Sequence, residues 1–395
     1  MSRFLAYAPD QAYLLPPNLD EVLGNEHLCF FVHRAVEQLD LRQLEQAYGS
    51  EGRLAYPPSM MLKVWLYAFA LGVNSTRRLE RRIQEDLAFR YLAGGLRPDH
   101  KTLSEFLRRH RRAINDVFTQ VVQMARRAGL GKLGHVAIDS TRVRANASRQ
   151  KMVEISDRQQ WAQDRRLVRS FQHKAATQDP EEDGGVQLSP AQQQSLAEQP
   201  IPALPKKGRQ QLSTTDPDSR FLRTAEGWTL GYTADLAVSD DHIIVGARVT
   251  QNATDNASLV PMLDEVERNC GGRPEKATGD AGFFSGAALH EMKRRGIDLY
   301  VPDNNLRHEM ETGKRAHGIG CRSIRDPEHL KLREKLRSPQ GRKIYQRRQA
   351  VVEPVFGILK EQRGMRKFRR RGLAAVTSEW LLAAIAYNLT RMAKR

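Results

Sequence analysis

The sequence predicts a mixed α/β protein whose sheet follows an all-α N-terminal domain. Residues 20–130 carry apolar side chains at helical spacing, and from Gly134 onward short apolar runs typical of strands alternate with helical stretches. A hairpin pattern comes first and the alternation follows, which indicates a mixed sheet with helices on its faces. We therefore expect a helical domain over residues 1–130 and an α/β core over residues 131–148 and 221–395.

Length and charge limit the class of protein. The 395 residues suffice for two or three domains at roughly 150 residues each. The 63 Lys and Arg residues exceed the 46 Asp and Glu residues and give a formal net charge of +17, which favours a polyanionic partner such as nucleic acid. An anionic membrane would satisfy the same charge, but the longest apolar stretch, Met60 to Leu71, contains Lys63 and falls short of the roughly 20 residues that span a bilayer. We expect no membrane contact.

The cysteines and the first residues favour a cytoplasmic protein. Cys29, Cys270 and Cys321 are odd in number and widely spaced, which is not the pattern of a disulfide framework. The segment after Met1 has no basic region followed by an apolar core, so we expect no secretory signal.

Two helices are expected in the middle of the N-terminal domain. Met60 to Leu71 is apolar on most helical faces, so this helix should be buried, and Pro57 ends whatever precedes it. An arginine-rich helix from Thr76 to about Glu85 would be capped by Asn74 or Ser75.

A third helix is expected to open with a capping box formed by Thr102 and Glu105 and to end before Gly129. Paired arginines recur along the domain, either as solvated helix faces or as phosphate contacts, and their repetition favours DNA binding. The pairs begin at Arg77, Arg81, Arg108, Arg111 and Arg126.

The core alternates strands and helices. The expected strands are His135–Asp139, Trp228–Val238, His242–Thr250, Lys276–Asp280 and Asp298–Val301. The expected helices are Asn256–Arg268, Ser285–Arg295, Arg342–Glu361 with Pro354 inside it, and Ser378–Met392. Residues 149–220 lack apolar periodicity and read as an insertion or flexible linker, and residues 307–338 remain unassigned.

Three acidic residues stand where a nuclease-like fold gathers metal ligands. Asp139 closes the apolar run from His135, Asp280 closes the run from Lys276, and Glu353 lies in a late helical stretch with apolar neighbours on both sides. Phosphoryl transfer needs charge neutralisation and in-line geometry, which two divalent ions about 3.5–4 Å apart supply. Because Mg²⁺ prefers carboxylate oxygens, the three residues predict a magnesium site that cuts or joins phosphodiester backbones.

Each of these carboxylates also has an ordinary interpretation. Asp139 would serve equally as a cap, Asp280 as a turn residue and Glu353 as a surface residue. Further acidic candidates in the core are Asp235, Asp255 and Asp264. Asp235 lies within an expected strand and is the natural substitute if Asp280 is not part of the site.

Three segments carry the acidic residues in order. They are residues 136–148 (VAIDSTRVRANAS), 279–283 (GDAGF) and 345–360, which contains VEPVFG. They resemble the three catalytic blocks of bacterial insertion-sequence transposases of the DDE type, and so do RPDHKT at 97–102 and TDPDSR at 215–220. The resemblance implies an RNase H-like core in which Asp139, Asp280 and Glu353 form the metal-binding catalytic triad.

The resemblance also implies DNA contacts on the last catalytic helix. The family places Tyr, Arg, Glu and Lys there, and Tyr345, Arg348, Glu353 and Lys360 match this signature. The interval from Arg348 to Glu353 is one residue longer than usual, which leaves Arg347 a rival. Lys360 lies nearly two turns beyond Glu353, so both can face one groove, although a solvated lysine is the alternative.

A basic run follows that helix. It consists of Arg366, Lys367, Arg369, Arg370 and Arg371, with Phe368 among them. We interpret the run as a DNA-backbone contact in which Phe368 is suited to base stacking, with a charged loop between helices as the alternative.

The implied function is that of a DNA transposase that cleaves element ends and joins them to target DNA. Mg²⁺ is the implied cofactor, with Mn²⁺ as a substitute, and the partners are double-stranded DNA and further copies of the chain in a homodimer or larger assembly. Two alternatives stay open: a non-catalytic DNA-binding relic, and an RNase H-like nuclease without strand transfer.

Overall fold

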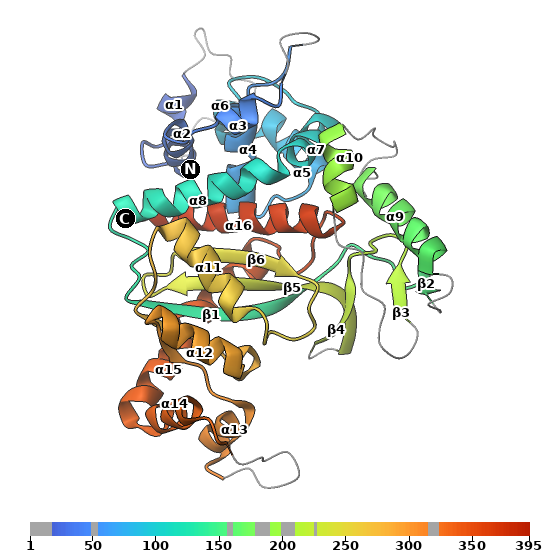
Figure 1. The fold of residues 1–395 in the computed structure, drawn as a ribbon. Coiled ribbons are helices and arrows are strands. Elements are labelled where there is room, and N and C mark those ends of the chain that lie inside the picture. The colour runs from blue at the N-terminus through green and yellow to red at the C-terminus, as the bar shows by residue number, and fades with distance from the viewer. Residues whose placement is uncertain are drawn as a thin grey trace, which may run out of the picture.

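The computed structural model describes residues 18–48, 54–155, 161–177, 190–198, 210–224, 227–314 and 324–395. In Figure 1 a helical domain lies above a curled mixed sheet, and helix α16 (Leu373–Ala393) runs between them. A smaller helical lobe lies below the sheet. The predicted RNase H-like α/β core after an all-α N-terminal domain is confirmed.

The N-terminal domain consists, within its described residues, of short helices around a buried one. They are α1 (Leu19–Val22), α2 (Leu28–Glu37), α3 (Arg42–Glu45), α4 (Pro58–Ala70), α5 (Thr76–Glu85), α6 (Leu87–Leu92), α7 (His100–Arg109) and α8 (Arg111–Arg127). Every residue of α4 from Met60 to Phe69 is buried, as its apolar faces predict. Ser75 caps α5, because its Oγ accepts from the backbone N–H of Arg78 at 3.5 Å.

The expected capping box at Thr102 is wrong. Helix α7 begins two residues earlier because Asp99 is the cap, with its Oδ1 accepting from the backbone N–H of Thr102 at 2.7 Å. Glu105 pairs instead with Arg108 at 2.6 Å, and Arg108 is buried. The predicted single helix is also interrupted at the buried His110, which separates α7 from α8.

The sheet has the strand order β4-β5-β1-β7-β8, with β6 pairing β5 beside β4. The strands are β1 (His135–Arg144), β4 (Arg220–Thr224), β5 (Gly227–Ser239), β6 (Ile244–Thr250), β7 (Lys276–Thr278) and β8 (Asp298–Tyr300). The central strand β1 pairs antiparallel with β5 and parallel with β7. A hairpin followed by parallel strands is the arrangement that the alternation of the sequence predicted.

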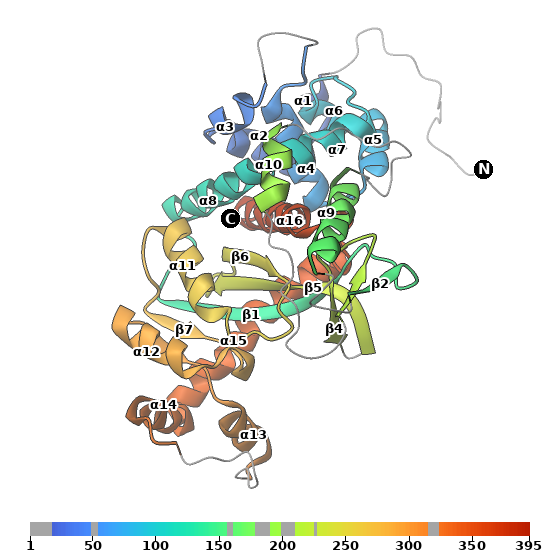
Figure 2. The same cartoon turned by 45° about the vertical axis from the view of Figure 1, so that its right-hand side comes forward.

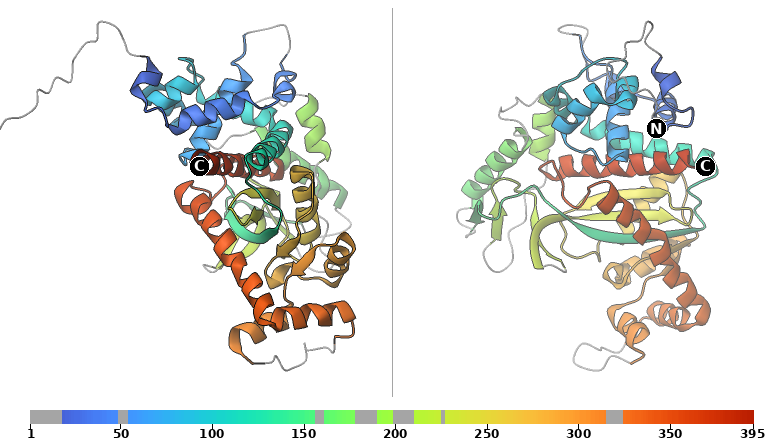
Figure 3. Two further views of the ribbon diagram at one scale, coloured as in Figure 1. Left: turned by 90° about the vertical axis from the view of Figure 1, so that its left-hand side faces the viewer. Right: turned by 180° about the vertical axis from the view of Figure 1, so that it is seen from behind.

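Helices cover both faces of the sheet. Helix α11 (Leu259–Cys270) lies in front of the sheet in Figure 1, and α15 (Pro339–Gly357) crosses the opposite face, which is turned to the viewer in the right-hand view of Figure 3. The lower lobe contains α12 (Gly286–Arg295), α13 (Asn304–Thr312) and α14 (Pro327–Arg337), so the unassigned segment 307–338 is partly helical. Helix α15 continues through Pro354 and becomes a π-helix, η2, over Ile358–Gln362.

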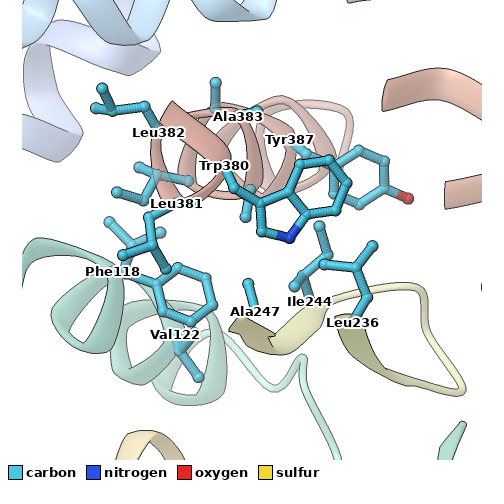
Figure 4. Close-up of a cluster of buried hydrophobic side chains, with 14 of the residues drawn as sticks. Phe118, Val122, Leu236, Ile244, Ala247, Trp380, Leu381, Leu382, Ala383 and Tyr387 are labelled. Atoms are coloured by element: carbon cyan, nitrogen blue, oxygen red, sulfur yellow. The ribbon is translucent and has the colours of Figure 1, made fainter. Parts of the chain in front are cut away.

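Helix α16 joins the two domains in one hydrophobic core. It begins five residues before the expected Ser378 and is buried over most of its length. Figure 4 shows Trp380 and Leu381 of α16 pointing towards Phe118 of α8 and Ala247 of β6. The Trp380 indole N–H also donates to the backbone carbonyl of Asp235 at 3.3 Å. The helical domain and the sheet therefore share their packing rather than folding as separate cores.

The segment expected as an insertion or flexible linker contains regular structure. It includes a two-stranded ribbon of β2 (Met152–Ile155) and β3 (Gln210–Ser213), with α9 (Trp161–Thr177) and α10 (Pro190–Glu198), which stand beside the core in Figure 2.

The TDPDSR segment at the end of this insertion belongs to the core. Asp218 accepts from the backbone N–H of Leu373 at 2.9 Å and from the Gln172 amide on α9 at 2.8 Å. Asp216 accepts from the backbone N–H of Gly372 at 3.2 Å. The two carboxylates therefore satisfy amides at the N-terminus of α16, which a flexible linker would not do.

None of the described helices combines the length and apolar composition needed to cross a membrane. Cys29 and Cys270 are buried free thiols, and Cys321 lies outside the described residues.

Candidate active site

Asp139 and Asp280 lie at the same level on neighbouring parallel strands. Ala137 of β1 is opposite Thr278 of β7, and each aspartate follows two residues later. The paired part of the two strands ends at Ala137 and Thr278, so Asp280 follows the carboxyl end of β7, whereas Asp139 lies beside it within β1, which continues to Arg144. Ligands of open α/β sheets bind at the carboxyl ends of strands. The two carboxylates interact, because the charge of Asp280 is one of the causes that raise the pKa of Asp139.

The Asp139 carboxylate is held on both oxygens. Its Oδ1 accepts from the backbone N–H of Ser140 at 2.9 Å, and its Oδ2 lies 2.9 Å from Arg348 Nη1. Burial raises the pKa of Asp139 to about 6, Arg348 and Ser140 oppose this shift, and the charges of Asp280 and Asp255 reinforce it. A buried carboxylate among like charges is an environment that a cation would stabilise.

Asp280 also has the local role that its position in the sequence suggested. It precedes a 3₁₀ turn over Ala281–Phe283, and its Oδ1 accepts from the backbone N–H of Gly282 at 2.8 Å. The turn fixes Oδ1 of Asp280, and in the described part of the chain no hydrogen bond engages its Oδ2. The turn interpretation and the site interpretation are therefore compatible.

One face of α15 lies toward these aspartates. Arg348 is only 8% exposed, and its guanidinium carbon is 5.9 Å from the centre of the Tyr345 ring. Burial raises the pKa of Tyr345, and the Asp280 charge adds to that shift, so Tyr345 is near Asp280. Arg347 points elsewhere: its side chain is 60% exposed and lies 3.0 Å from Asp240. Of the two rival arginines, Arg348 is the neighbour of Asp139.

Glu353 does not join the two aspartates. Val351, Val352 and Val355 occupy the buried stripe of α15, and Glu353 lies on the exposed side, so its apolar neighbours do not turn it inward. In the described part of the chain, no three His, Cys, Asp or Glu side chains are close enough together to hold a metal ion. The structure brings Asp139 and Asp280 together and leaves Glu353 apart.

The other acidic candidates differ in their position relative to Asp139 and Asp280. Asp235 is fully buried on β5 opposite Ser140, so it faces the side of the sheet opposite to Asp139 and is not a substitute for Asp280. Asp264 forms an ion pair with Arg295. Asp255, in contrast, lies next to Asp280: a methyl carbon added at Gly282 would be 3.0 Å from Asp280 Oδ1 and 3.3 Å from Asp255 Oδ2.

A basic groove of about 650 Å³ begins two residues beyond Asp139 on β1. Its cationic lining consists of Arg142, Arg144, Arg149, Lys360, Arg366 and Lys367. Trp228, 62% exposed, forms part of the wall. Arg142, Arg144 and Arg149 were missed as site residues. Arg142 and Arg144 lie at alternate positions of β1, which could have suggested a shared face, whereas Arg149 lies beyond the strand.

Lys360 connects the groove with the aspartates. It lies in the π-helical turn η2, a feature that often marks functional sites. Burial and the nearby Arg366 lower the pKa of Lys360, whereas the Asp139 charge raises it. Lys360 is therefore both a groove residue and a neighbour of the Asp139 carboxylate.

The basic run after α15 divides into two parts. Arg366 and Lys367 line the groove, whereas the backbone N–H groups of Arg369 and Arg370 both donate to Glu379. Arg370 also donates from Nη2 to the backbone carbonyl of Ser104 at 2.8 Å, and Arg371 donates from Nε to that of Asn146 at 3.1 Å.

Phe368 is fully buried against Tyr232 and Trp380, so the expected base stacking by Phe368 is wrong. The charged neighbours of Phe368 gave no sign that its ring fills the core.

The donor set fits a divalent cation. Asp139 and Asp280 offer hard carboxylate oxygens on neighbouring segments of the sheet, and Mg²⁺ is commonly held by one or two carboxylates with water and phosphate oxygens completing its coordination.

Comparisons with known families identify the family of the chain. Residues 209–389 match the family model described as a transposase DDE domain, and residues 17–109 match the transposase domain (DUF772) model. No curated protein and no solved structure matches the chain. Members of this family bind DNA and use divalent metal ions. Because the two matches cover residues 17–109 of the helical domain and residues 209–389 of the core in the expected order, the chain belongs to the DDE-type insertion-sequence transposases.

Proposed function

We propose that the protein cleaves the ends of an insertion element and joins them to target DNA by phosphoryl transfer. The observation that carries the proposal is the meeting of Asp139 and Asp280 at one end of a groove lined by six cations. Cations that contact phosphates fix the register of DNA without reading its sequence. The groove would therefore lead a strand to the two carboxylates.

The residues of the chain divide the work. Asp139 and Asp280 would hold the cation, and the exposed carboxylate of Glu353 would complete the triad once DNA is bound. A bound Mg²⁺, or Mn²⁺ in its place, would activate the attacking oxygen and stabilise the leaving oxygen. Arg348 and Lys360 are placed to contact the phosphate beside Asp139. Acting on two element ends implies at least a dimer when DNA is bound.

The test is strand cleavage and joining of end-bearing DNA in the presence of Mg²⁺. Asp139→Asn, Asp280→Asn and Glu353→Gln should each lower cleavage at least roughly a hundredfold, since loss of a metal-binding charge removes several kcal/mol of transition-state stabilisation. Asp264→Asn is the matched control, because Asp264 pairs with Arg295 on the surface. Full activity of the Asp139 and Glu353 variants would refute the proposal.

The same assay separates the two alternatives. A DNA-binding relic would show salt-sensitive binding that is indifferent to divalent ions and no cleavage product. A nuclease without transfer would cut the DNA but give no joined product when a separate target duplex is supplied.

A further inference from the structure

We propose that Arg142 and Asp255 form an exchangeable ion pair that couples DNA binding in the basic groove to cation binding at Asp139 and Asp280. The inference rests on the proposed function and adds two residues to it.

Arg142 belongs to the groove and to the acidic site at once. It lies on β1 three residues after Asp139 and lines the groove, with 21% of its side chain exposed. Its Nη1 donates to Asp255 Oδ1 at 3.1 Å, and its Nη2 donates to Asp255 Oδ2 at 3.4 Å and to the Ala253 carbonyl at 3.0 Å. Both oxygens of Asp255 are therefore occupied by a side chain that faces the groove.

Asp255 is in turn part of the acidic surroundings of the site. Its Oδ2 and the Oδ1 of Asp280 flank the same backbone position, Gly282. Its charge also contributes to the raised pKa of Asp139. The Asp255 side chain is only 13% exposed. Asp139, Asp280 and Asp255 thus lie near one another, with Arg348 paired to Asp139 and Arg142 paired to Asp255.

A DNA phosphate in the groove would compete for Arg142. The planar guanidinium pairs with phosphate oxygens in the same two-pronged geometry that it uses with carboxylates. When Arg142 turns to a phosphate, Asp255 is left as a poorly solvated, unpaired carboxylate, which is costly. A divalent cation held by Asp139 and Asp280 would offset that cost, so DNA and cation should each tighten the binding of the other.

The experiment measures Mn²⁺ affinity of the full chain by calorimetry, with and without a duplex that lacks element ends and so is not an end-cleavage substrate. DNA should tighten Mn²⁺ binding of the wild type by at least about fivefold, the lower limit of typical coupling between sites. Arg142→Gln should tighten Mn²⁺ binding without DNA and show no further gain with it. Asp255→Asn should lose the gain while still binding DNA.

Arg149→Gln is the matched control, because Arg149 lines the same groove but forms no ion pair with a carboxylate in the described part of the chain. It should weaken DNA binding and leave the Mn²⁺ affinity of the DNA-free protein unchanged. Asp255→Glu, which keeps the carboxylate that Asp255→Asn removes, should retain part of the gain in Mn²⁺ affinity caused by DNA. Thermal unfolding checks that each variant is folded. If Asp255→Asn does not fold, the Mn²⁺ affinity of Arg142→Gln tests the proposal.

The proposal is overturned if Arg142→Gln fails to tighten Mn²⁺ binding in the absence of DNA, or if a folded Asp255→Asn variant keeps the full gain. Failure of the proposed function gives a different result. If the proposed function is wrong, Asp139→Asn will not change the Mn²⁺ affinity. If Asp139→Asn lowers the Mn²⁺ affinity but DNA does not raise that of the wild type, only the coupling is refuted.

Discussion

Arg348 donates from Nη1 to Oδ2 of Asp139 at 2.9 Å, and this contact ties the helix that carries Glu353 to the central strand of the sheet. The Oδ1 of Asp139 already accepts from the backbone N–H of Ser140, so the arginine takes the remaining oxygen. The guanidinium is largely buried, which makes this contact different in kind from the exposed pair of Arg347 with Asp240.

Arg348→Gln should therefore lower cleavage at least tenfold and lower the free energy of unfolding by about 1–3 kcal/mol. The stability loss falls below the 3–5 kcal/mol of a fully buried pair because Asp139 keeps some contact with solvent. Arg347→Gln, the matched control, should cost less than about 1 kcal/mol because its pair is exposed. Urea unfolding and the cleavage assay measure both effects, and equal losses for the two variants would contradict the assignment.

The sequence predicts the strands that carry Asp139 and Asp280 because their apolar runs are short and end in an acidic residue. It cannot give the rotation of α15, which decides that Arg348 faces Asp139 and that Glu353 faces outward. It also cannot find the pair of Arg142 with Asp255, since the two residues are 113 positions apart and meet only through the sheet.

The basic run shows the same limit. Seven consecutive residues from Arg366 to Gly372 look like one charged loop. The backbone N–H groups of Arg369 and Arg370, however, donate to the buried carboxylate of Glu379 on α16. The sequence shows where basic residues occur but not which of them form tertiary hydrogen bonds. The division of the run follows from tertiary packing alone.

Lys367→Gln and Arg370→Gln should therefore have different effects. Lys367 lines the groove, so its removal should weaken DNA binding for all sequences and lower the slope of log affinity against log salt by about 1. Arg370 donates to Ser104 of the helical domain, so its removal should lower the unfolding temperature with little change in that slope. Fluorescence anisotropy over a salt series and thermal unfolding measure the two effects. An unchanged slope for Lys367→Gln would exclude it as a phosphate contact.

Gly72→Ala should destabilise the contact between the helical domain and the end of the catalytic helix. Gly72 has a φ of +71°, and an added Cβ would lie 2.7 Å from the backbone oxygen of Gln362. Left-handed backbone costs a non-glycine residue about 1–2 kcal/mol, and the clash with a backbone atom adds to this. We expect a loss of about 2–4 kcal/mol in the free energy of unfolding, measured in urea.

The matched control for this change is Gly94→Ala. Gly94 has a φ of +56°, but no atom lies within 4 Å of an added Cβ, so only the backbone strain of about 1 kcal/mol should remain. The difference between the two variants isolates the contact at Gln362. An equal loss in the free energy of unfolding for both variants would contradict the close contact between Gly72 and the backbone of Gln362.

Glu379 should make the stability of the protein fall as pH rises. Its side chain on α16 is buried, and burial raises its pKa from 4.5 to about 7 although the amides of Arg369 and Arg370 oppose the shift. A carboxyl group with a higher pKa in the folded state binds more protons there than in the unfolded chain. Its contribution is therefore complete below about pH 4.5 and is lost as the pH rises through about 7.

This loss amounts to about 3 kcal/mol, since each unit of pKa shift corresponds to about 1.4 kcal/mol. Glu379→Gln keeps the size of the side chain and an acceptor oxygen for the two amides but has no proton to lose. The variant should show a smaller fall in the free energy of unfolding between pH 5 and pH 8 than the wild type. Some fall should remain, because burial also raises the pKa of Asp216 and Asp235 to about 7. Urea unfolding at the two pH values measures it, and an identical fall in both proteins would show that Glu379 does not titrate in this range.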